Sequence, residues 1–300
     1  MHDEDQLTVD MPIAELGRQI MAEQFAIMGQ YGADLRDNTA VISVHETRKA
    51  IRRTFTAIDM FSPYFAPDVL TNYRRRLKKL MKRLARSRDT AVFINKLQIY
   101  AADSAASLTS LERYWQDQLS VANANVRLYL ARPRWAAFWQ EYAAFIATSG
   151  QGVLPAKIGD PIRARYITPI LLYRRTAAVR AYDDYLHTET DLSIKQLHAL
   201  RIQCKELRYA FQFFTPLLGP EIAPVIAVLE ALQLNLGDLN DARVALRRLD
   251  ATPGRETAVA HYRAFQTNET VRLLAEFHPL WAELNAPAWR RNLAAAISLL

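Results

Sequence analysis

Two segments of the chain combine a histidine with basic residues at helical spacing, a pattern that suits the binding of an anion. The two sets are His45, Arg48 and Arg52 in the first segment and His198, Arg201 and Lys205 in the second. Positions i, i+3 and i+7 lie on one face of a helix, so each set forms a single basic stripe. Stacked like charges repel by roughly a few tenths of a kcal/mol per pair. Stability does not require such stripes, whereas binding of an anion does.

The two segments also match each other in register over a longer stretch. Besides the histidines, the matched pairs are Arg48 and Arg201, Arg52 and Lys205, Phe61 and Phe214, Pro63 and Pro216, and, after a one-residue adjustment, Leu84 and Leu236, and Asp89 and Asp241. Apolar core spacing alone would not require the polar residues to repeat as well. The sequence therefore predicts an internal duplication.

Positive charge is concentrated in the first half of the chain. Residues 45–88 hold thirteen Lys and Arg against three acids, a local charge of +10, while the whole chain carries only +7. A local field of this kind is typical of a docking surface for a polyanion. The predicted binding residues are His45, Arg48, Lys49, Arg52, Arg53, Arg75, Lys78, Lys79, Lys82, Arg83, Arg86, Arg88, His198, Arg201, Lys205 and Arg208. Candidates of lower rank are Arg174, Arg175, Arg180, Arg243, Arg247 and Arg248.

The composition favours helices as the elements that position these residues. Half of the residues are apolar and only nine are glycine, which predicts an all-α fold with a sizeable core. Helices are expected over 12–37, 43–60, 68–86, 90–101, 105–130, 134–148, 162–187, 193–214, 220–237, 240–249, 256–277 and 287–300. Glycine and proline cluster in 149–161. We expect a tail (1–10), a first repeat (11–150), a linker (151–160) and a second repeat (161–300).

Both halves resemble the CHAD domain, a family whose signature is a helix that begins His-x-x-Arg and carries further Arg and Lys. Leu236, Gly237 and Asp241 match its later Leu-Gly-x-x-x-Asp element, whereas Ala85 replaces the glycine in the first half. Phe55 likewise stands where the second half has Arg208. The resemblance implies two four-helix bundles related by a pseudo-two-fold axis. It also implies a basic surface that binds inorganic polyphosphate. Recruitment to polyphosphate granules is a role that could follow from such binding, and the sequence itself does not disclose it.

Two other functions remain open. The same positive field could bind the backbone of RNA or DNA, although Tyr73 and Tyr209 occupy apolar positions and few other rings accompany the basic residues. An enzyme of phosphate metabolism ranks third, with Asp89 and Asp241 as its metal ligands; helix capping is the commoner role for such aspartates. No catalytic motif, metal site or cofactor is predicted. We expect a non-enzymatic binding protein.

The remaining features concern the cellular compartment of the protein. Cys204 is the single cysteine, which excludes an internal disulfide. We expect no secretory signal and no segment with the ~20 apolar residues of a membrane helix. The sequence thus predicts a cytoplasmic protein without a membrane partner. The sequence does not indicate an oligomeric state.

Overall fold

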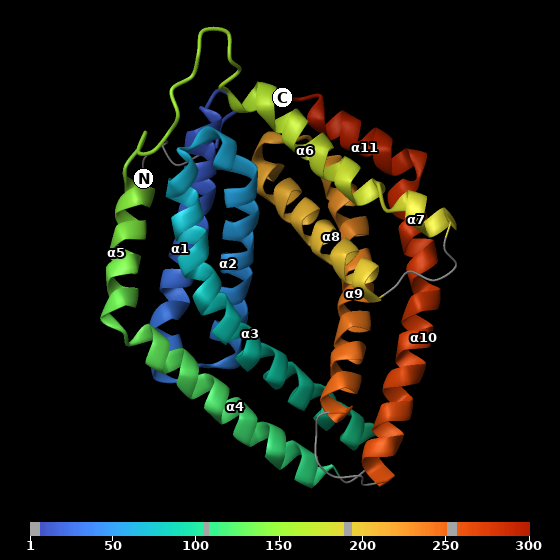
Figure 1. Cartoon of the computed structure of the whole chain (residues 1–300). Coiled ribbons are helices and arrows are strands. Elements are labelled where there is room, and N and C mark those ends of the chain that lie inside the picture. Colours follow the sequence, from blue (N-terminus) through green and yellow to red (C-terminus); the bar gives the residue numbers. More distant parts are fainter. Residues whose placement is uncertain (1–6, 105–107, 189–193, 251–256) are drawn as a thin grey trace. The chain divides into compact units, whose positions relative to one another are not determined.

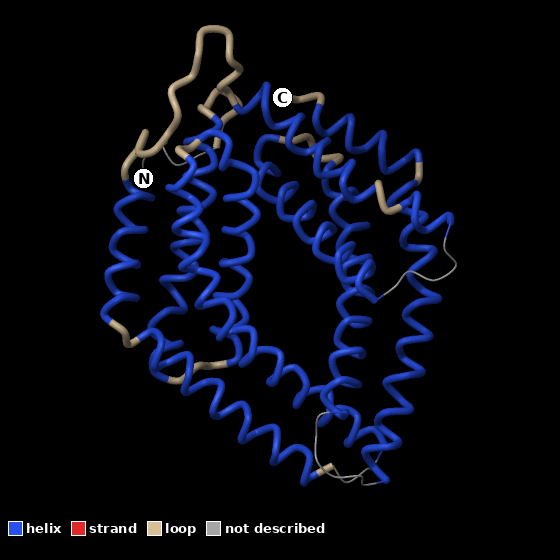
Figure 2. Tube along the Cα trace, in the orientation of Figure 1, coloured by secondary structure: helices blue, strands red, loops and turns tan. Residues whose placement is uncertain are grey.

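The computed structural model describes residues 7–104, 108–188, 194–250 and 257–300. These residues form α-helices and short 3-10 turns, and no strand occurs among them (Figure 2). An isolated antiparallel bridge pairs Phe65 with Val153. The all-α class predicted from the composition is confirmed.

The chain divides into two compact units (Figure 1). Unit 1 comprises residues 11–162, and unit 2 comprises residues 163–300 together with residues 8–10. The helices of unit 1 are α1 (Ile13–Asp37), α2 (Val41–Phe61), α3 (Pro67–Ser104), α4 (Thr109–Leu130) and α5 (Pro133–Ala147). Those of unit 2 are α6 (Ala164–Arg180), α7 (Asp183–Thr188), α8 (Ile194–Phe214), α9 (Ile222–Asp250), α10 (Thr257–Asn285) and α11 (Pro287–Ile297). The expected helix starts at residues 105, 193 and 256, and residues 1–6 of the expected tail, lie outside the described residues.

The core of unit 1 forms where α1, α2 and α3 pack together, with α4 against α3 and α5 against α1 (Figure 1). Apolar residues at intervals of three and four supply the buried faces, including Leu16, Ile51 and Leu77. Helix α1 packs tightly against α2 at Gly17, where an added Cβ would lie 2.5 Å from the Cγ of Phe61. This position therefore requires glycine for steric reasons.

Two long helices correct the predicted boundaries. The sequence predicts helix ends at residues 86 and 237, but α3 continues to Ser104 and α9 continues to Asp250. Residues 86–90 contain neither proline nor glycine, so nothing interrupts the backbone hydrogen bonds of α3. Gly237 is tolerated because buried leucines on either side of it, Leu236 and Leu239, hold α9 against its neighbours. Asp89 and Asp241 consequently lie inside helices and are not caps.

Two further boundaries in unit 2 also differ from the prediction. The helix expected over 162–187 is broken between Arg180 and Asp183, where α7 begins. The Asp183 carboxylate accepts hydrogen bonds from Trp281 Nε1 (2.9 Å) and Asn285 Nδ2 (3.2 Å), which fixes α7 against α10. The helix expected to end at residue 277 continues through Pro279 to Asn285. Burial of Trp281 and Leu284 keeps this extension in place.

The two motif helices have the same length and the same position relative to their histidines. Helix α2 and helix α8 each contain 21 residues, and each is followed directly by a three-residue 3-10 helix, Ser62–Tyr64 and Thr215–Leu217. All four boundaries are related by the offset that places His45 on His198. The duplication itself stays a prediction, and this common register supports it.

One described helix, α9, is long and apolar enough to cross a membrane, which corrects the expectation that no segment would be. The criterion rests on length and composition alone, and 44% of the apolar window is buried. Helix α9 packs against α8, α10 and α11. Buried core helices commonly satisfy the same criterion, so this feature is weak evidence for a membrane segment.

The glycine-rich segment after α5 is tied to the rest of unit 1. Ala66 N donates to Gly152 O (2.8 Å), and Leu154 N donates to Tyr64 O (3.0 Å). Arg18 of α1, only 3% exposed, donates to the carbonyls of Phe145 (2.6 Å) and Gln151 (2.7 Å). Its guanidinium therefore joins α1 to the end of α5 and to the segment that follows.

We expect Arg18→Ala to lower the free energy of unfolding by about 3 kcal/mol, because two carbonyls lose a charged donor and a buried side chain leaves a cavity. Urea denaturation measures this change. Arg36→Ala, which removes an exposed arginine from the same helix, is the control and should change stability by less than about 0.5 kcal/mol. Equal effects of the two substitutions would contradict the role given to Arg18.

Candidate anion-binding surfaces

Helix α3 separates its basic residues from its core residues. Leu77, Leu80 and Leu84 are buried on one face. Arg75, Lys79, Lys82 and Arg86 recur at intervals of three and four on another face and are exposed. Both sets share one helix, so burial of the leucines directs the cations outward.

The basic face of α3 forms one wall of a cleft of about 1080 Å³, and α4 and α5 supply the rest. We call it the cationic cleft. Its lining residues are Asn72, Arg75, Arg76, Lys79, Lys82, Arg83, Arg86, Ala122, Asn125, Tyr129, Arg132, Arg134, Trp135 and Phe138. Eight of these are Lys or Arg, and none of the lining residues in the described part of the chain is a carboxylate.

Three of the eight cations were not among the predicted binding residues: Arg76, Arg132 and Arg134. Arg132 and Arg134 flank Pro133, the first residue of α5. An Arg-Pro-Arg sequence at a helix start is a local signal for outward-pointing cations. Its position opposite α3, however, depends on how α4 and α5 fold back on α3.

Contacts with aromatic rings and neighbouring polar groups hold several of these cations in place. Arg83 lies 4.1 Å from the ring centre of Tyr129, and its Nη1 donates to Lys79 O at 2.8 Å. Arg76 lies 4.7 Å from the ring centre of Phe138 and forms an ion pair with Glu141. Such contacts restrict the side chains before a ligand arrives, which reduces the entropy lost on binding.

The first predicted stripe lies where α2 packs on α3. Arg48 is 8% exposed, and its Nη1 donates to the Asp89 carboxylate at 2.8 Å. Burial lowers the pKa of Arg48, the neighbouring Asp89 raises it again, and Arg52 and Arg88 lower it further. Arg48 and Asp89 therefore form a partly buried ion pair that joins the two helices.

His45 is exposed at the edge of this pair, with its Nε2 3.8 Å from Glu46. Partial burial lowers its pKa, and Arg88, Lys49 and Arg52 lower it further, against an opposing effect of Glu46. Lys49 in turn pairs with Glu46 at 2.7 Å. These effects together favour the neutral form of the His45 imidazole in the free protein.

The other predicted residues of unit 1 have different surroundings. Arg52 and Arg88 are half-buried beside Arg48. Arg53 is close enough to Glu23 of α1 to lower its pKa, against the larger effect of burial, which raises it. Lys78 is exposed but does not line the cationic cleft. Most of the predicted residues of unit 1 therefore lie in two places, the cleft and the α2–α3 contact.

Unit 2 has a smaller cleft of about 500 Å³ between α8 and α9. Its described lining residues are Leu197, His198, Arg201, Leu236, Leu239, Asn240, Arg243, Leu246 and Arg247. Burial lowers the pKa of Arg243. Arg208 pairs with Glu230 at 3.1 Å and does not line this cleft, and neither does Lys205. Unit 2 therefore presents fewer cations, beside an apolar wall.

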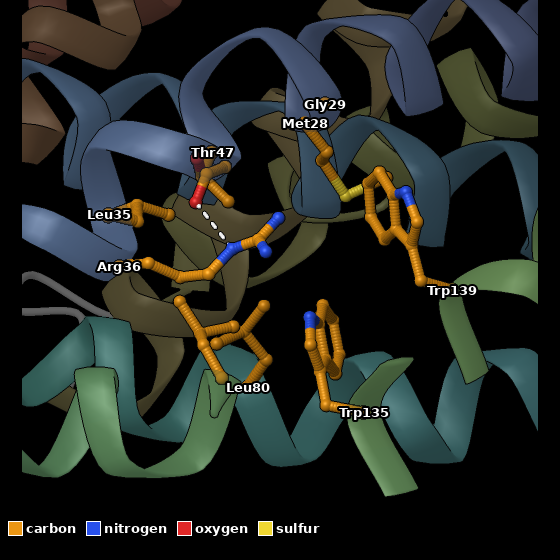
Figure 3. A pocket seen from close by; sticks show the side chains of 10 residues that line it. Met28, Gly29, Leu35, Arg36, Thr47, Leu80, Trp135 and Trp139 are labelled. Carbon is orange, nitrogen blue, oxygen red and sulfur yellow. Dashed lines mark hydrogen bonds between the residues drawn. The ribbon is translucent and has the colours of Figure 1, made fainter. Parts of the chain in front are cut away.

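The distribution of aromatic residues differs from the sequence expectation. The basic segments contain few rings, but α4 and α5 bring Tyr129, Trp135 and Phe138 into the cationic cleft. Trp135 also lines a cavity of about 50 Å³ together with Trp139, Met28, Leu80 and further residues (Figure 3). Aromatic rings therefore do accompany the cations of this cleft, so the expected lack of nearby rings is wrong here.

Clusters of acidic, histidine or cysteine side chains could hold a metal ion, and a cysteine could supply a reactive thiol. Among the described residues, no three or more of them are arranged to hold a metal ion. Cys204 is buried, and burial raises the pKa of its thiol to about 12. Among the described residues, neither a metal cluster nor the Cys204 thiol supplies a reactive group to the two clefts.

Comparison with known proteins identifies the family. A model of the CHAD domain matches residues 19–250, so the chain belongs to the CHAD family. The structure is similar to the crystal structure of the CHAD domain from the plant Ricinus communis, with a TM-score of 0.79 and 20% identity over 93% of this chain and 94% of that chain. It is also similar to PptA from Streptomyces chartreusis, with a TM-score of 0.71 and 17% identity over 91% of this chain and 100% of that chain. At these identities the likeness shows a shared fold. No curated protein matches the sequence.

We expect Asp89→Asn to lower the free energy of unfolding by about 1 kcal/mol, because Arg48 keeps a hydrogen-bond acceptor but loses a charged partner. Asp89 is half exposed, which limits the loss. Asp103→Asn, an exposed change on the same helix, should have almost no effect. Urea denaturation of both variants tests the Arg48–Asp89 ion pair. Equal stability of Asp89→Asn and the unsubstituted protein would rule out a contribution of this ion pair to stability.

Proposed function

We propose that this protein binds inorganic polyphosphate without chemically changing it, and that the cationic cleft of unit 1 is the principal binding site. The observation that carries the proposal is the gathering of eight Lys and Arg in one cleft that no carboxylate lines among the described residues. Membership of a family associated with polyphosphate binding supports it.

The chemistry of the cleft suits a chain of phosphates. Polyphosphate offers charged oxygens and no bases or sugars, so positioned cations must provide its recognition. Guanidinium groups bind phosphate oxygens in bidentate fashion, and charge-assisted hydrogen bonds contribute roughly 1.5–3 kcal/mol each. Arg75, Lys79, Lys82 and Arg86 repeat along about three turns of α3, so one extended chain can contact them in succession.

Unit 2 adds a secondary site in this proposal. His198 and Arg201 occupy the same motif positions as His45 and Arg48, but only four basic or histidine residues line the cleft. We expect this site to bind polyphosphate more weakly than unit 1. Recruitment of a cytoplasmic protein to polyphosphate granules is the cellular role that would follow.

Binding of nucleic acid is the second candidate, and two half-buried rings in the cationic cleft, Tyr129 and Trp135, favour it. Bases stack on exposed aromatic side chains, and phosphates bind the surrounding cations. Competition between long-chain polyphosphate, single-stranded RNA and duplex DNA of matched phosphate content, at about 0.15 M salt, separates the two functions. Preference for polyphosphate supports the proposal, and equal or stronger binding of nucleic acid overturns it.

Reversing three charges in the cleft tests the site directly. We expect the triple variant Arg75→Glu, Lys79→Glu, Lys82→Glu to weaken polyphosphate binding about a hundredfold or more, because three attractive contacts become repulsive. Isothermal titration calorimetry at several salt concentrations measures the affinity. Fewer phosphate contacts should also make the affinity less dependent on salt.

A matched control separates the cleft from net charge. Arg113, Arg290 and Arg291 are exposed and line neither cleft. Their simultaneous change to Glu alters the net charge by the same amount and should weaken binding only severalfold. A comparable loss in both triple variants would show that net charge and not the cationic cleft governs binding.

The affinity should also depend on pH through His45. Burial and the neighbouring cations lower its pKa, and a polyanion that extends from the cleft to the α2–α3 contact would raise that pKa by offsetting Arg88 and Arg52. Binding then takes up a proton, so affinity rises as the pH falls from about 7.5 to about 5.5. His45→Gln should reduce this rise, whereas His278→Gln, in the other unit, should not. Identical pH profiles for all three proteins would exclude His45.

A further inference from the structure

Trp135 differs from the other two rings of the cationic cleft. Arg83 lies over Tyr129 and Arg76 lies over Phe138, so a guanidinium already covers one face of each. The contacts of Trp135 in the described structure are with the rings of Tyr129, Phe138 and Trp139, at centroid distances of 5.0–6.0 Å. Trp135 is only half-buried and lines the cleft. It is therefore the ring best placed to stack on a ligand.

Amide side chains add a second kind of contact to the cleft. Asn125 of α4 is exposed and lines the same cleft as Trp135. A carboxamide presents a donor and an acceptor side by side, which matches the edge of a purine or pyrimidine base. A phosphate chain alone makes no use of an indole face or of a paired donor and acceptor.

We infer that the cationic cleft binds nucleoside polyphosphates, with the phosphates on the cations of α3 and the base on Trp135 and Asn125. The inference rests on the proposed function, since the phosphates occupy the same cations. A volume of about 1080 Å³ is ample for a nucleotide, because ligand pockets typically measure roughly 300–1,000 Å³. The base adds selectivity that inorganic phosphates of equal length lack.

The neighbouring small cavity supplies a matched control. Figure 3 shows Trp135 and Trp139 on two sides of this cavity, with Met28 beside Trp139. Both indoles come from α5 and are half-buried. Trp135 lines the cationic cleft as well, whereas Trp139 does not. The same substitution at the two positions thus separates stacking on a ligand from packing within unit 1.

The experiment compares ATP with tripolyphosphate, which has the same number of phosphates, by calorimetry without divalent metal. We expect ATP to bind about tenfold more tightly than tripolyphosphate, a ratio that corresponds to 1.4 kcal/mol and lies within the range of base stacking on aromatic side chains. Trp135→Leu should abolish this advantage and leave tripolyphosphate affinity unchanged. Trp139→Leu should preserve the advantage.

The other outcomes test the inference and the proposed function separately. Equal affinity for ATP and tripolyphosphate, or equal loss in Trp135→Leu and Trp139→Leu, overturns the inference. If long-chain polyphosphate still binds in that case, the proposed function stands. Nucleotide binding that depends on Trp135 without polyphosphate binding supports the inference and overturns the proposed function. If Trp135→Leu does not fold, Asn125→Ala provides the test: weakened ATP binding with unchanged tripolyphosphate binding supports the inference, and no change overturns it.

Discussion

Repulsion among like charges is the physical constraint on which the rest of unit 1 depends. Eight cations line one cleft, and six of them lie on α3 within residues 75–86. An isolated helix with this sequence would be destabilised by its own charges. Burial of Leu77, Leu80 and Leu84 against the neighbouring helices offsets that cost. Burial of these apolar side chains thus keeps the cations of α3 close together, although their mutual repulsion opposes this arrangement.

The basic residues near this surface fall into two groups with different partners. Carboxylates pair with Arg48, Arg74 and Arg76 from neighbouring helices, namely Asp89, Asp59 and Glu141. These pairs join α2, α3 and α5 and hold the helices in position. Lys79, Lys82 and Arg86 instead face the cleft from exposed positions. A scaffold of paired cations therefore presents a second set to an anionic ligand, which is the arrangement that preorganised binding requires.

The same motif occurs in both units, but the clefts beside the two motif helices differ in positive charge. In unit 1 the helix after the motif helix carries a long basic face, and α4 and α5 add arginines and aromatic rings opposite it. In unit 2 the corresponding helix, α9, is largely apolar up to residue 239, and leucines form much of its cleft wall. The histidine and arginine occupy the same positions in both motif helices. The residues around them decide how much positive charge each cleft gathers.

The composition of the sequence by itself determined the helical class. Local periodicity determined the bounds of α2 to within two residues and the basic face of α3, because a helix places residues on its faces according to spacing alone. The sequence did not determine the partner of Asp89 or the approach of Arg132, Arg134 and Trp135 to α3. Those arrangements join residues about 40 to 60 positions apart, and only the packing of α2, α4 and α5 around α3 decides them. Spacing along one helix carries no information about which neighbouring helix will cover its faces.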